Sequence, residues 1–344
     1  MWKTEASVGT HSLTRWDLAN RLAVPGGFVA GLRQTDGFVV VPHLLPDVDA
    51  LASAAALCTV LRRLGKRAWV EAPDVPDLHA WVLDPALRRA DSEGGVRIAV
   101  DTARPERLQV PGPVALCLDH HEDNPGFAEV VDWVAPAPSC TCLVAALADA
   151  LGLKTDAALA TTLYAGLLGD TSGFREIGGP DAFAWAERFA RAGADCGGVA
   201  ERFHRRSPGF WSLLAEVQVG ARRLAAPGAP PLHAVPVTAD QPLRHGIDPY
   251  EHAMLPTHLS PPPGGVLVVL QEGAHGVRLR LRSRGYDVLP LAHLLGGGGH
   301  PNSAGVQLRG HGLAAGEQRL VAAWAQLAGV PASDVCRQPV PPVV

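Results

Sequence analysis

Between residues 37 and 152 the sequence alternates short apolar runs with amphipathic stretches, and this alternation limits the accessible folds more than any other feature. The segments expected to be strands are 37–43, 67–72, 96–102, 113–121 and 130–136, and those expected to be helices are 49–65, 79–90 and 139–152, the last with Ser139 as its N-cap. Strands alternating with helices form crossover units, which build a largely parallel sheet. The sequence therefore predicts an α/β fold, with ligands bound beyond the carboxyl ends of the strands.

The remainder of the chain predicts a second, smaller α/β domain. Helices are expected over 157–170, 181–195 and 197–224, and the Pro- and Gly-rich stretch 225–232 marks a linker. Strand-like runs, a glycine run, a closing helix and a Pro-rich tail, expected to be loose, follow. The predicted organisation is an N-terminal domain over 1–195 with an extension over 1–36, a helical connector and linker over 196–230, a C-terminal domain over 231–335 and a tail over 336–344.

Length and composition agree with a soluble two-domain protein. The chain has 344 residues, of which 47% are hydrophobic, and domains average roughly 150 residues. No apolar run reaches the ~18 residues of a membrane span, and the N-terminus lacks the basic-then-apolar pattern of a signal peptide. The six cysteines form no CxxC pair, which favours free thiols. We therefore expect a cytoplasmic protein without a membrane partner.

The charge balance bears on nucleic-acid partners. With 30 basic and 34 acidic residues, the net charge is −4 and the isoelectric point is about 6.4. A protein that follows a long nucleic-acid strand usually carries a basic stripe or a high isoelectric point. The composition argues against such a partner, but it leaves open a nucleotide substrate held by a few arginines.

Acidic and histidine residues follow the predicted strands at several points. The candidates are His43, Asp47 and Asp49 after the first strand, Asp101 after the third, Asp119, His120 and His121 after the fourth, and Asp170 at the end of an apolar helix. A single carboxylate at a strand end is usually a helix N-cap. Several carboxylates at one edge of a sheet repel each other and raise each other's pKa, and bound cations relieve this repulsion.

The number and types of these side chains suit two divalent metals. Carboxylate oxygens with a minority of imidazole nitrogens favour Mn²⁺, with Mg²⁺ or Fe²⁺ as further candidates, over a thiolate-rich zinc site. A two-metal centre stabilises the attacking and leaving oxygens of a phosphoryl displacement and lowers the pKa of a bound water. The residues alone therefore predict metal-assisted phosphoester hydrolysis.

Five motifs in order resemble those of a known family. They are HLLPDVDALAS (43–53), the isolated Asp101, DHH (119–121), GDTSGFR (169–175) and RSRGYDVLPLAHLLGGGGHPNSAG (282–305). The first four resemble the DHH phosphoesterase superfamily, and the last resembles its DHH-associated nucleotide-binding domain. The sequence departs from the family pattern at Leu45, where many relatives carry a polar residue, and at Ser303, where an alanine is common.

The resemblance implies roles for the candidate residues. One metal would be held by His43, Asp47 and Asp101, and the other by Asp49, Asp101, His120 and Asp170, with Asp101 bridging the two. His121 would lie beside the scissile phosphate as electrostatic stabiliser or proton donor, and Asp119 would orient its neighbours. For His121 a purely structural role, hydrogen-bonded behind the site, remains open.

A substrate-binding role in the C-terminal domain is implied for Arg282, Ser283, Arg284, Gly297, Gly298, Gly299 and His300. Glycines let the backbone approach a ligand closely, and their N–H groups can cradle an anion. Arginine offers paired donors to phosphate and a flat face to a base. A glycine run is also compatible with a flexible turn. Arg278 and Arg280 share the strand phase of Arg282, so part of this row is equally compatible with a solvated strand face.

The resemblance is strongest to the NrnA-type nano-oligoribonucleases. It implies a Mn²⁺-dependent phosphodiesterase that hydrolyses short RNA or DNA oligonucleotides and dinucleotides to mononucleotides by two-metal activated water, with pAp and c-di-AMP as further candidate substrates. One alternative is a RecJ-like single-strand DNA exonuclease, although the chain has no room for further domains beyond residue 330. Another is a non-catalytic nucleotide-binding regulator. For residues 1–36, an extra helix and a homodimer contact are both open.

Overall fold

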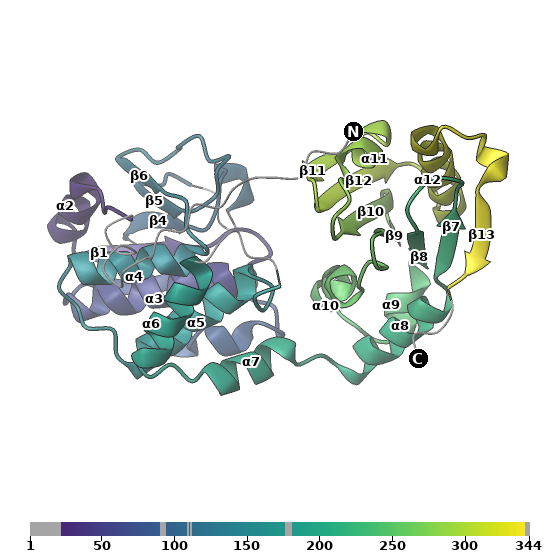
Figure 1. The fold of residues 1–344 in the computed structure, drawn as a ribbon. Helices are drawn as coiled ribbons and strands as arrows, with labels where there is room; N and C mark the ends of the chain where they lie inside the picture. Colours follow the sequence, from purple (N-terminus) through teal and green to yellow (C-terminus); the bar gives the residue numbers. More distant parts are fainter. Residues whose placement is uncertain (1–21, 90–93, 109, 111, 176–180, 341–344) are drawn as a thin grey trace. The chain divides into compact units, whose positions relative to one another are not determined.

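The computed structural model describes residues 22–89, 94–108, 110, 112–175 and 181–340 (Figure 1). The chain divides into two compact units, Met1–Arg205 and Arg206–Val344. Residues 196–230, predicted as a connector, are therefore shared between the two units. Each unit has its own sheet and its own hydrophobic core.

The first unit contains a six-stranded, fully parallel sheet, which confirms the predicted α/β class. Its strands are β1 (Gly37–Val41), β2 (Arg67–Glu71), β3 (Arg88–Arg89), β4 (Val96–Val100), β5 (Leu116–Asp119) and β6 (Val131–Val134), in the spatial order β3-β2-β1-β4-β5-β6. The chain thus builds outward from β1 first to one side and then to the other. The adjacent strands β1 and β4 form the switch point, where parallel sheets place their ligands.

Helices surround this sheet. They are α2 (Gly26–Gln34), α3 (Val48–Arg63), α4 (Cys140–Ala150), α5 (Ala157–Asp170), α6 (Asp181–Arg191) and α7 (Cys196–His204), with a short 3-10 turn at Pro105–Arg107. Helices α3, α4 and α5 lie against one face (Figure 1), and a smaller apolar cluster including Val39, Trp69 and Ala99 covers the other. Because both faces are covered, β1 is a continuous buried run rather than an alternating one.

The helix predicted over 79–90 is wrong. The described part of this segment forms two 3-10 turns, Ala80–Val82 and Pro85–Leu87, followed by β3. Pro85 cannot continue a preceding helix, and the Asp84 side chain accepts a hydrogen bond from the Ala86 amide to start the second turn. Arg88 and Arg89 then pair with the edge of β2, an interaction that helical periodicity does not reveal.

The second unit is built on a seven-stranded mixed sheet. Its strands are β7 (Arg222–Ala225), β8 (Leu232–Val237), β9 (Val266–Gly273), β10 (Gly276–Ser283), β11 (Gly298–His300), β12 (Ser303–Arg309) and β13 (Cys336–Pro339). The spatial order is β11-β12-β10-β9-β8-β7-β13, and β8 and β9 are parallel while the other pairs are antiparallel. The predicted second α/β unit is confirmed.

Helices cover this second sheet unevenly. They are α8 (Pro208–Val219), α9 (Asp240–Arg244), α10 (Pro249–Met254), α11 (Leu289–Leu294) and α12 (Leu313–Ala328), with 3-10 turns at Leu255–His258 and Ala332–Asp334. On one face, α11 and α12 pack against β9, β10 and β12. On the other face, α8 and the 3-10 turn at Leu255–His258 pack against β8 and β9.

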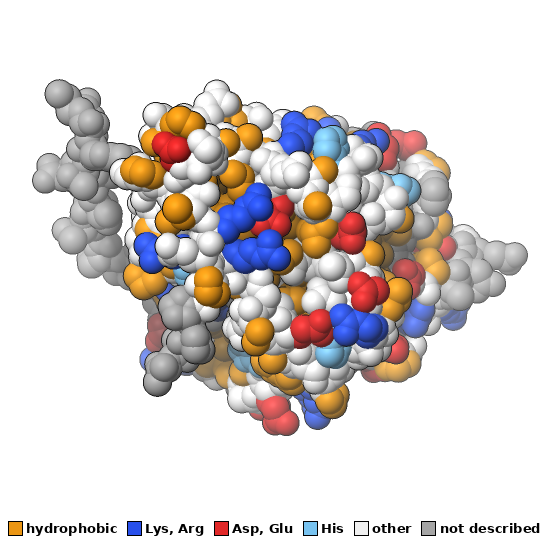
Figure 2. Space-filling view, turned by 90° about the vertical axis from the view of Figure 1, so that its right-hand side faces the viewer, with side chains coloured by type: hydrophobic (Ala, Val, Ile, Leu, Met, Phe, Trp, Pro, Cys, Tyr) orange, Lys and Arg blue, Asp and Glu red, His pale blue; other side chains and the backbone are white. Residues whose placement is uncertain are grey.

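Two further expectations about the second half of the chain are wrong. The single helix expected over 197–224 is broken into α7, α8 and β7, because Ser207 caps a new helix whose first residue is Pro208. The tail is not loose throughout, since β13 pairs with β7 at the edge of the sheet. Figure 2 looks onto this edge, where basic and acidic side chains are interspersed. Arg222 of β7 forms an ion pair with Glu317 at 3.1 Å.

The sequence expectations about thiols and membranes can also be compared with the structure. All six cysteines are free, as predicted. Among the described residues, every helix is too short or too polar to cross a membrane.

Candidate metal centre

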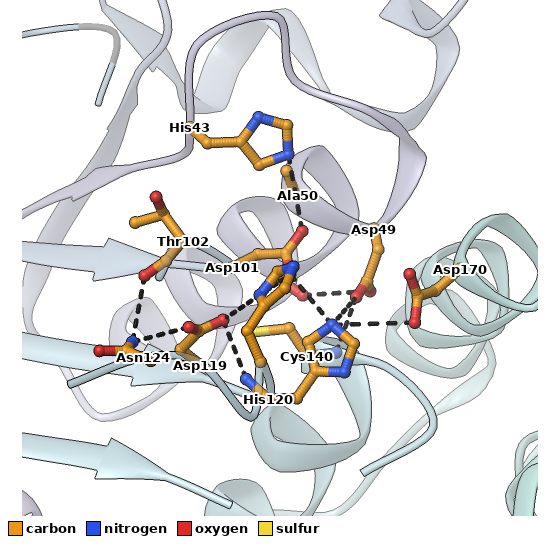
Figure 3. A network of polar contacts seen from close by, with 12 residues as sticks. His43, Asp49, Ala50, Asp101, Thr102, Asp119, His120, Asn124, Cys140 and Asp170 are labelled. Atoms are coloured by element: carbon orange, nitrogen blue, oxygen red, sulfur yellow. Dashed lines mark hydrogen bonds and ion pairs between the residues drawn. The ribbon is translucent and has the colours of Figure 1, made fainter. Parts of the chain in front are cut away.

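The acidic and histidine side chains singled out in the sequence meet at the carboxyl ends of β1, β4 and β5 (Figure 3). His43 follows β1, Asp101 follows β4, and Asp119 is the last residue of β5, with His120 and His121 directly after it. Asp170, the last residue of α5, reaches the same place from another element. The structure therefore brings all eight residues into one site at the switch point.

His43, Asp47 and Asp101 form the first of two overlapping groups. The Nε2 atom of His43 lies 3.8 Å from Asp47 Oδ1 and 3.8 Å from Asp101 Oδ2. Asp47 also caps α3, because its Oδ1 accepts a hydrogen bond from the Ala50 amide at 3.0 Å. The His43 Nδ1 atom is 2.8 Å from the Leu44 carbonyl, so Nε2 is the nitrogen left to face the carboxylates.

His120 is at the centre of the second group. Its Nε2 atom lies 3.3 Å from Asp101 Oδ1, 3.7 Å from Asp170 Oδ2 and 4.0 Å from Asp49 Oδ2. The other ring nitrogen, Nδ1, is 3.0 Å from the Ala137 carbonyl, which fixes the orientation of the ring. Asp101 belongs to both groups through different oxygens, the arrangement expected of a bridging carboxylate.

Asp49 is anchored by the start of α4. Its Oδ2 accepts a hydrogen bond from the Cys140 amide at 2.7 Å, and its Oδ1 accepts one from the Thr141 amide at 3.3 Å. The positive end of the helix dipole therefore faces this buried carboxylate. The expectation that Ser139 caps α4 is wrong for its side chain, whose Oγ contacts Thr141 Oγ1 at 2.7 Å instead of an amide.

Two glycines let α5 approach this anchor closely. A Cβ atom added at Gly166 would clash with Asp49 Oδ1 and with the Thr141 side chain, and one at Gly169 would lie 2.8 Å from Val48 Cβ. Real Cβ atoms essentially never approach other atoms this closely. Asp170 reaches the site because α5 packs against the start of α3 at this short distance.

Asp119 is fully buried and holds its neighbours in place. Its Oδ1 lies 2.8 Å from His121 Nδ1 and accepts a hydrogen bond from the His120 amide at 2.9 Å. Its Oδ2 accepts a hydrogen bond from Asn124 Nδ2 at 2.7 Å (Figure 3). With both oxygens engaged, Asp119 is suited to orient His121 and unsuited to bind a cation itself.

The close carboxylates change the protonation of the histidines. Burial by itself lowers the pKa of His43, but Asp47 and Asp101 outweigh burial and raise this pKa to about 9. Burial likewise lowers the pKa of His120, while the carboxylates of Asp101, Asp49 and Asp170 raise it to about 11. Burial raises the pKa of Asp170 to about 7. Protons on the histidines thus offset the negative charge of the site.

Two atoms at the centre of the site are placed to bind a cation, whose positive charge the protons on the histidines replace only in part. Among the described residues, Asp101 Oδ1 and His120 Nε2 are buried and lack a hydrogen-bond partner. Donor atoms that share one cation at bond lengths of about 2.1 Å lie roughly 3 to 4 Å apart, which is the spacing found in both groups. The oxygen-rich donor set with imidazole nitrogens suits Mn²⁺, Mg²⁺ or Fe²⁺. The residues present therefore fit a pair of divalent cations.

Backbone strain concentrates around this site. The described residues other than glycine with φ in the left-handed region are Leu45 (56°), Asp101 (56°), Ser172 (50°) and Phe174 (61°). Such conformations cost free energy and persist where the surrounding structure enforces them. Asp101 is the shared carboxylate, and the other three flank the loops that carry Asp47 and Asp170.

Several residues of this site carry no sequence signal strong enough to single them out. Asn124 supports Asp119, and Ser53 Oγ lies 3.4 Å from Asp49 Oδ1. The amides of Cys140 and Thr141 act through the backbone, so their side-chain identity says nothing about this role. Ser53 is the last residue of the motif at 43–53, but its contact with Asp49 forms only in the folded chain.

In the second unit, the predicted substrate-binding residues fall into two sets. Arg282 on β10 and His300 on β11 both stand opposite Ser303 of β12, so these three residues form one row across the sheet. Gly297, Gly298 and Gly299 lead into and through β11 beside this row, and Arg284 is exposed just after β10. Ser283 is buried, and its hydroxyl donates to the Gly265 carbonyl and accepts from the Tyr286 amide. Its polar atom is engaged within the protein.

Comparison with known proteins places this fold and site. Residues 37–167 match the family model described as DHH family, N-terminal domain. Over 304 residues the chain is 29% identical to a Thermus thermophilus protein named bifunctional oligoribonuclease and PAP phosphatase NrnA, covering 83% of this chain and 88% of that protein. A Streptococcus mutans protein named probable bifunctional oligoribonuclease and PAP phosphatase NrnA is 32% identical over 154 residues, covering 42% and 49%.

A solved structure extends the likeness of fold. The exopolyphosphatase-related protein from Bacteroides fragilis superposes with a TM-score of 0.72 at 19% identity, covering 93% of this chain and 98% of that one. The fold and site define an α/β protein with a cluster of carboxylates and histidines at a switch point. Residues 37–167 are thus similar to the N-terminal domain of the DHH family, and most of the chain is similar to a relative named as an NrnA protein.

Proposed function

We propose that the chain is a divalent-metal-dependent phosphodiesterase that hydrolyses short oligonucleotides to mononucleotides. The observation that carries the proposal is the buried pair Asp101 Oδ1 and His120 Nε2, which lie 3.3 Å apart at the centre of the eight convergent side chains. Neither atom has a hydrogen-bond partner among the described residues. The Thermus thermophilus relative is named as an oligoribonuclease and PAP phosphatase, which supports the same substrate class and adds 3′-phosphoadenosine 5′-phosphate as a second substrate.

The proposal assigns His43, Asp47 and Asp101 to one cation and Asp49, Asp101, His120 and Asp170 to the other. Bound there, two divalent cations, in our proposal Mn²⁺, would supply Lewis acidity to the phosphoryl oxygens and lower the pKa of an attacking water.

His121 is proposed to act on the substrate directly. It is half-exposed, whereas Asp119 behind it is fully buried. The contact between His121 Nδ1 and Asp119 leaves Nε2 as the nitrogen available to a phosphate. The same contact raises the pKa of His121, which favours the protonated ring over the neutral one. A positively charged ring held in this way can stabilise charge on the phosphate or give a proton to the leaving oxygen.

A product assay on the purified chain tests the proposal. RNA of two to about twenty-four nucleotides, matched DNA, 3′-phosphoadenosine 5′-phosphate and c-di-AMP would be offered with Mn²⁺ and with EDTA. Rapid Mn²⁺-dependent cleavage of the shortest RNA is the expected result. Equal or faster degradation of long DNA would contradict the assignment to short oligonucleotides.

The matched variant is Asp101→Asn. Asparagine tolerates the left-handed conformation found at this position (φ 56°), so the fold is kept while the shared carboxylate is lost. We expect hydrolysis to fall at least about a hundredfold, since the residue serves both groups. An enzyme that lost no activity in this variant would refute the assigned metal centre. A pure nucleotide-binding regulator would instead show no activity to lose.

A further inference from the structure

One face of β10 carries a row of three arginines, of which only the last belongs to the motif at 282–305. Val277, Leu279 and Leu281 point into the core beneath α11 and α12. Arg278, Arg280 and Arg282 alternate with them and face the other way. In the described residues, the apolar cluster on that other face includes side chains of β8 and β9 and none of β10, β11 or β12.

Arg280 occupies an unusual position for a surface strand residue. It is half-buried, and its Nε atom is buried without a hydrogen-bond partner among the described residues. Burial and the neighbouring charges of Arg278 and Arg282 lower the pKa of Arg280 to about 10. A buried donor without a partner, between two groups of the same charge, costs stability and calls for an explanation.

A pocket lies beside this arginine. It has a volume of about 240 Å³ and is lined by Arg278, Arg280, His252, Gln271, Glu272 and Gln307, together with the β9–β10 turn. His252 brings a second buried nitrogen without a partner among the described residues, Nε2, to the same pocket. Burial lowers the pKa of His252, so its ring is neutral at pH 7 and can donate one hydrogen bond.

The remaining lining residues are compatible with an anion. Glu272 is the acidic residue of the pocket, and its carboxylate already accepts hydrogen bonds from the amides of Leu313 and Ala239, at 3.2 and 3.3 Å.

On the side of Arg280 away from β9, the neighbouring residues in the sheet are Gly305 and Gly298. A Cβ at Gly298 would meet nothing within 4 Å, and one at Gly305 would meet only the Leu279 carbonyl at 4.0 Å. The surface next to Arg280 is therefore uncovered.

We propose that Arg278, Arg280 and His252 form a phosphate-binding site on the open face of β10, next to the row of Arg282, Ser303 and His300. Alternate residues of a strand are roughly 6.6 Å apart, a step comparable to that between successive phosphates of an extended single strand. The bound group is a phosphate mono- or diester. It belongs either to a nucleotide beyond the first two of a longer substrate, a reading that rests on the proposed function, or to a separate small phosphorylated molecule.

The first test is a binding measurement that does not depend on hydrolysis. The full chain is titrated with inorganic pyrophosphate in EDTA, by calorimetry, as wild type and as Arg280→Met. We expect binding to weaken at least about tenfold in Arg280→Met, the loss typical of one charge-assisted hydrogen bond. Arg223→Gln, which removes an exposed charge from β7 of the same unit, is the control and should bind like wild type.

Thermal denaturation distinguishes a binding residue from a structural one. Without ligand, Arg280→Met should melt at a higher temperature than wild type, because the buried unpaired donor and the repulsion from Arg278 are removed. With pyrophosphate, it should gain less in melting temperature than wild type. Unchanged pyrophosphate affinity in Arg280→Met, or no binding to wild type at millimolar concentrations, would overturn the proposal.

Kinetic arms with Mn²⁺ identify the source of the phosphate. If it belongs to the substrate, Arg280→Met should lower kcat/KM for tri- and tetranucleotides while the dinucleotide is cleaved as before. If it belongs to a separate molecule, added AMP should change dinucleotide cleavage more in wild type than in Arg280→Met, because product inhibition at the active site is common to both. A chain that hydrolyses none of these substrates would refute the proposed function, and the pyrophosphate titration would still decide whether this site exists.

Discussion

Binding of divalent cations to the metal-free chain should release protons, and the number can be worked out from the site. At neutral pH the nearby carboxylates keep His43 and His120 protonated, with pKa values of about 9 and 11. A histidine must be neutral to bind a metal. Loading the site with Mn²⁺ at pH 7 should therefore release at least about two protons per chain.

The number of protons depends on pH in a defined direction. The pKa of Asp170 is about 7, so this carboxyl is about half protonated at pH 7 and mostly protonated at pH 6. The release should therefore be larger at pH 6 than at pH 7, and the apparent affinity for Mn²⁺ should increase as the pH is raised from 6 to 8.

Calorimetry in two buffers with different ionisation enthalpies at the same pH measures this release directly. The variant His43→Gln should release about one proton fewer than wild type, because one of the two protonated rings is gone. His233→Gln, in the second unit, should leave the release unchanged. Release of fewer than one proton by wild type at pH 7 would refute the reasoning, since the histidines would then be neutral before the metal binds.

Three further predictions concern stability. The metal-free chain should lose stability as the pH rises from about 6.5 through 9, because the protonated His43 ring, whose pKa is raised to about 9, stabilises the fold and loses its proton over this range. Melting temperatures in EDTA that stay constant over this range would contradict this prediction. Gly166→Ala should destabilise the chain by roughly 1–3 kcal/mol and weaken Mn²⁺ binding in calorimetry, because the added Cβ would clash with Asp49. Gly197→Ala is the control and should do neither, because a Cβ added there meets no atom within 4 Å. Leu45→Asn should raise the free energy of unfolding in urea by about 0.5–1 kcal/mol, because asparagine tolerates the left-handed backbone conformation of this residue better than leucine. Leu44→Asn, at the neighbouring exposed leucine, is the control, and an equal gain there would assign the effect to the loss of an exposed apolar side chain.

The pattern of apolar runs was sufficient to predict the parallel sheet and most of the candidate site. A strand buried on both faces appears in the sequence as a continuous apolar run, and its end is visible as the first polar residue. His43, Asp101 and Asp119 stand at such ends, so their convergence follows from strand direction alone. The family motifs added Asp170, which no strand end would have indicated.

Local periodicity failed where a distant segment decides the conformation. Residues 88 and 89 form a strand because the edge of β2 is available to pair with them. Cys336–Pro339 forms β13 because β7 lies next to it, although the two are more than a hundred residues apart in sequence. An edge strand of two to four residues has too few positions to show a period of its own.

The sequence by itself therefore determined the class of fold and the residue types that meet at its edge, because both follow from short-range patterns of burial and polarity. Only the tertiary structure decided how these residues are supported. The amide that anchors Asp49 belongs to Cys140, 91 residues away, and the close approach of α5 depends on the missing side chain of Gly166. The same holds for Arg280, which is a surface residue by its strand phase. In the fold it is partly buried, and its Nε atom has no hydrogen-bond partner in the described part of the chain. Hydrogen bonds and close contacts between remote segments form only once packing has brought the segments together, so no local pattern carries them.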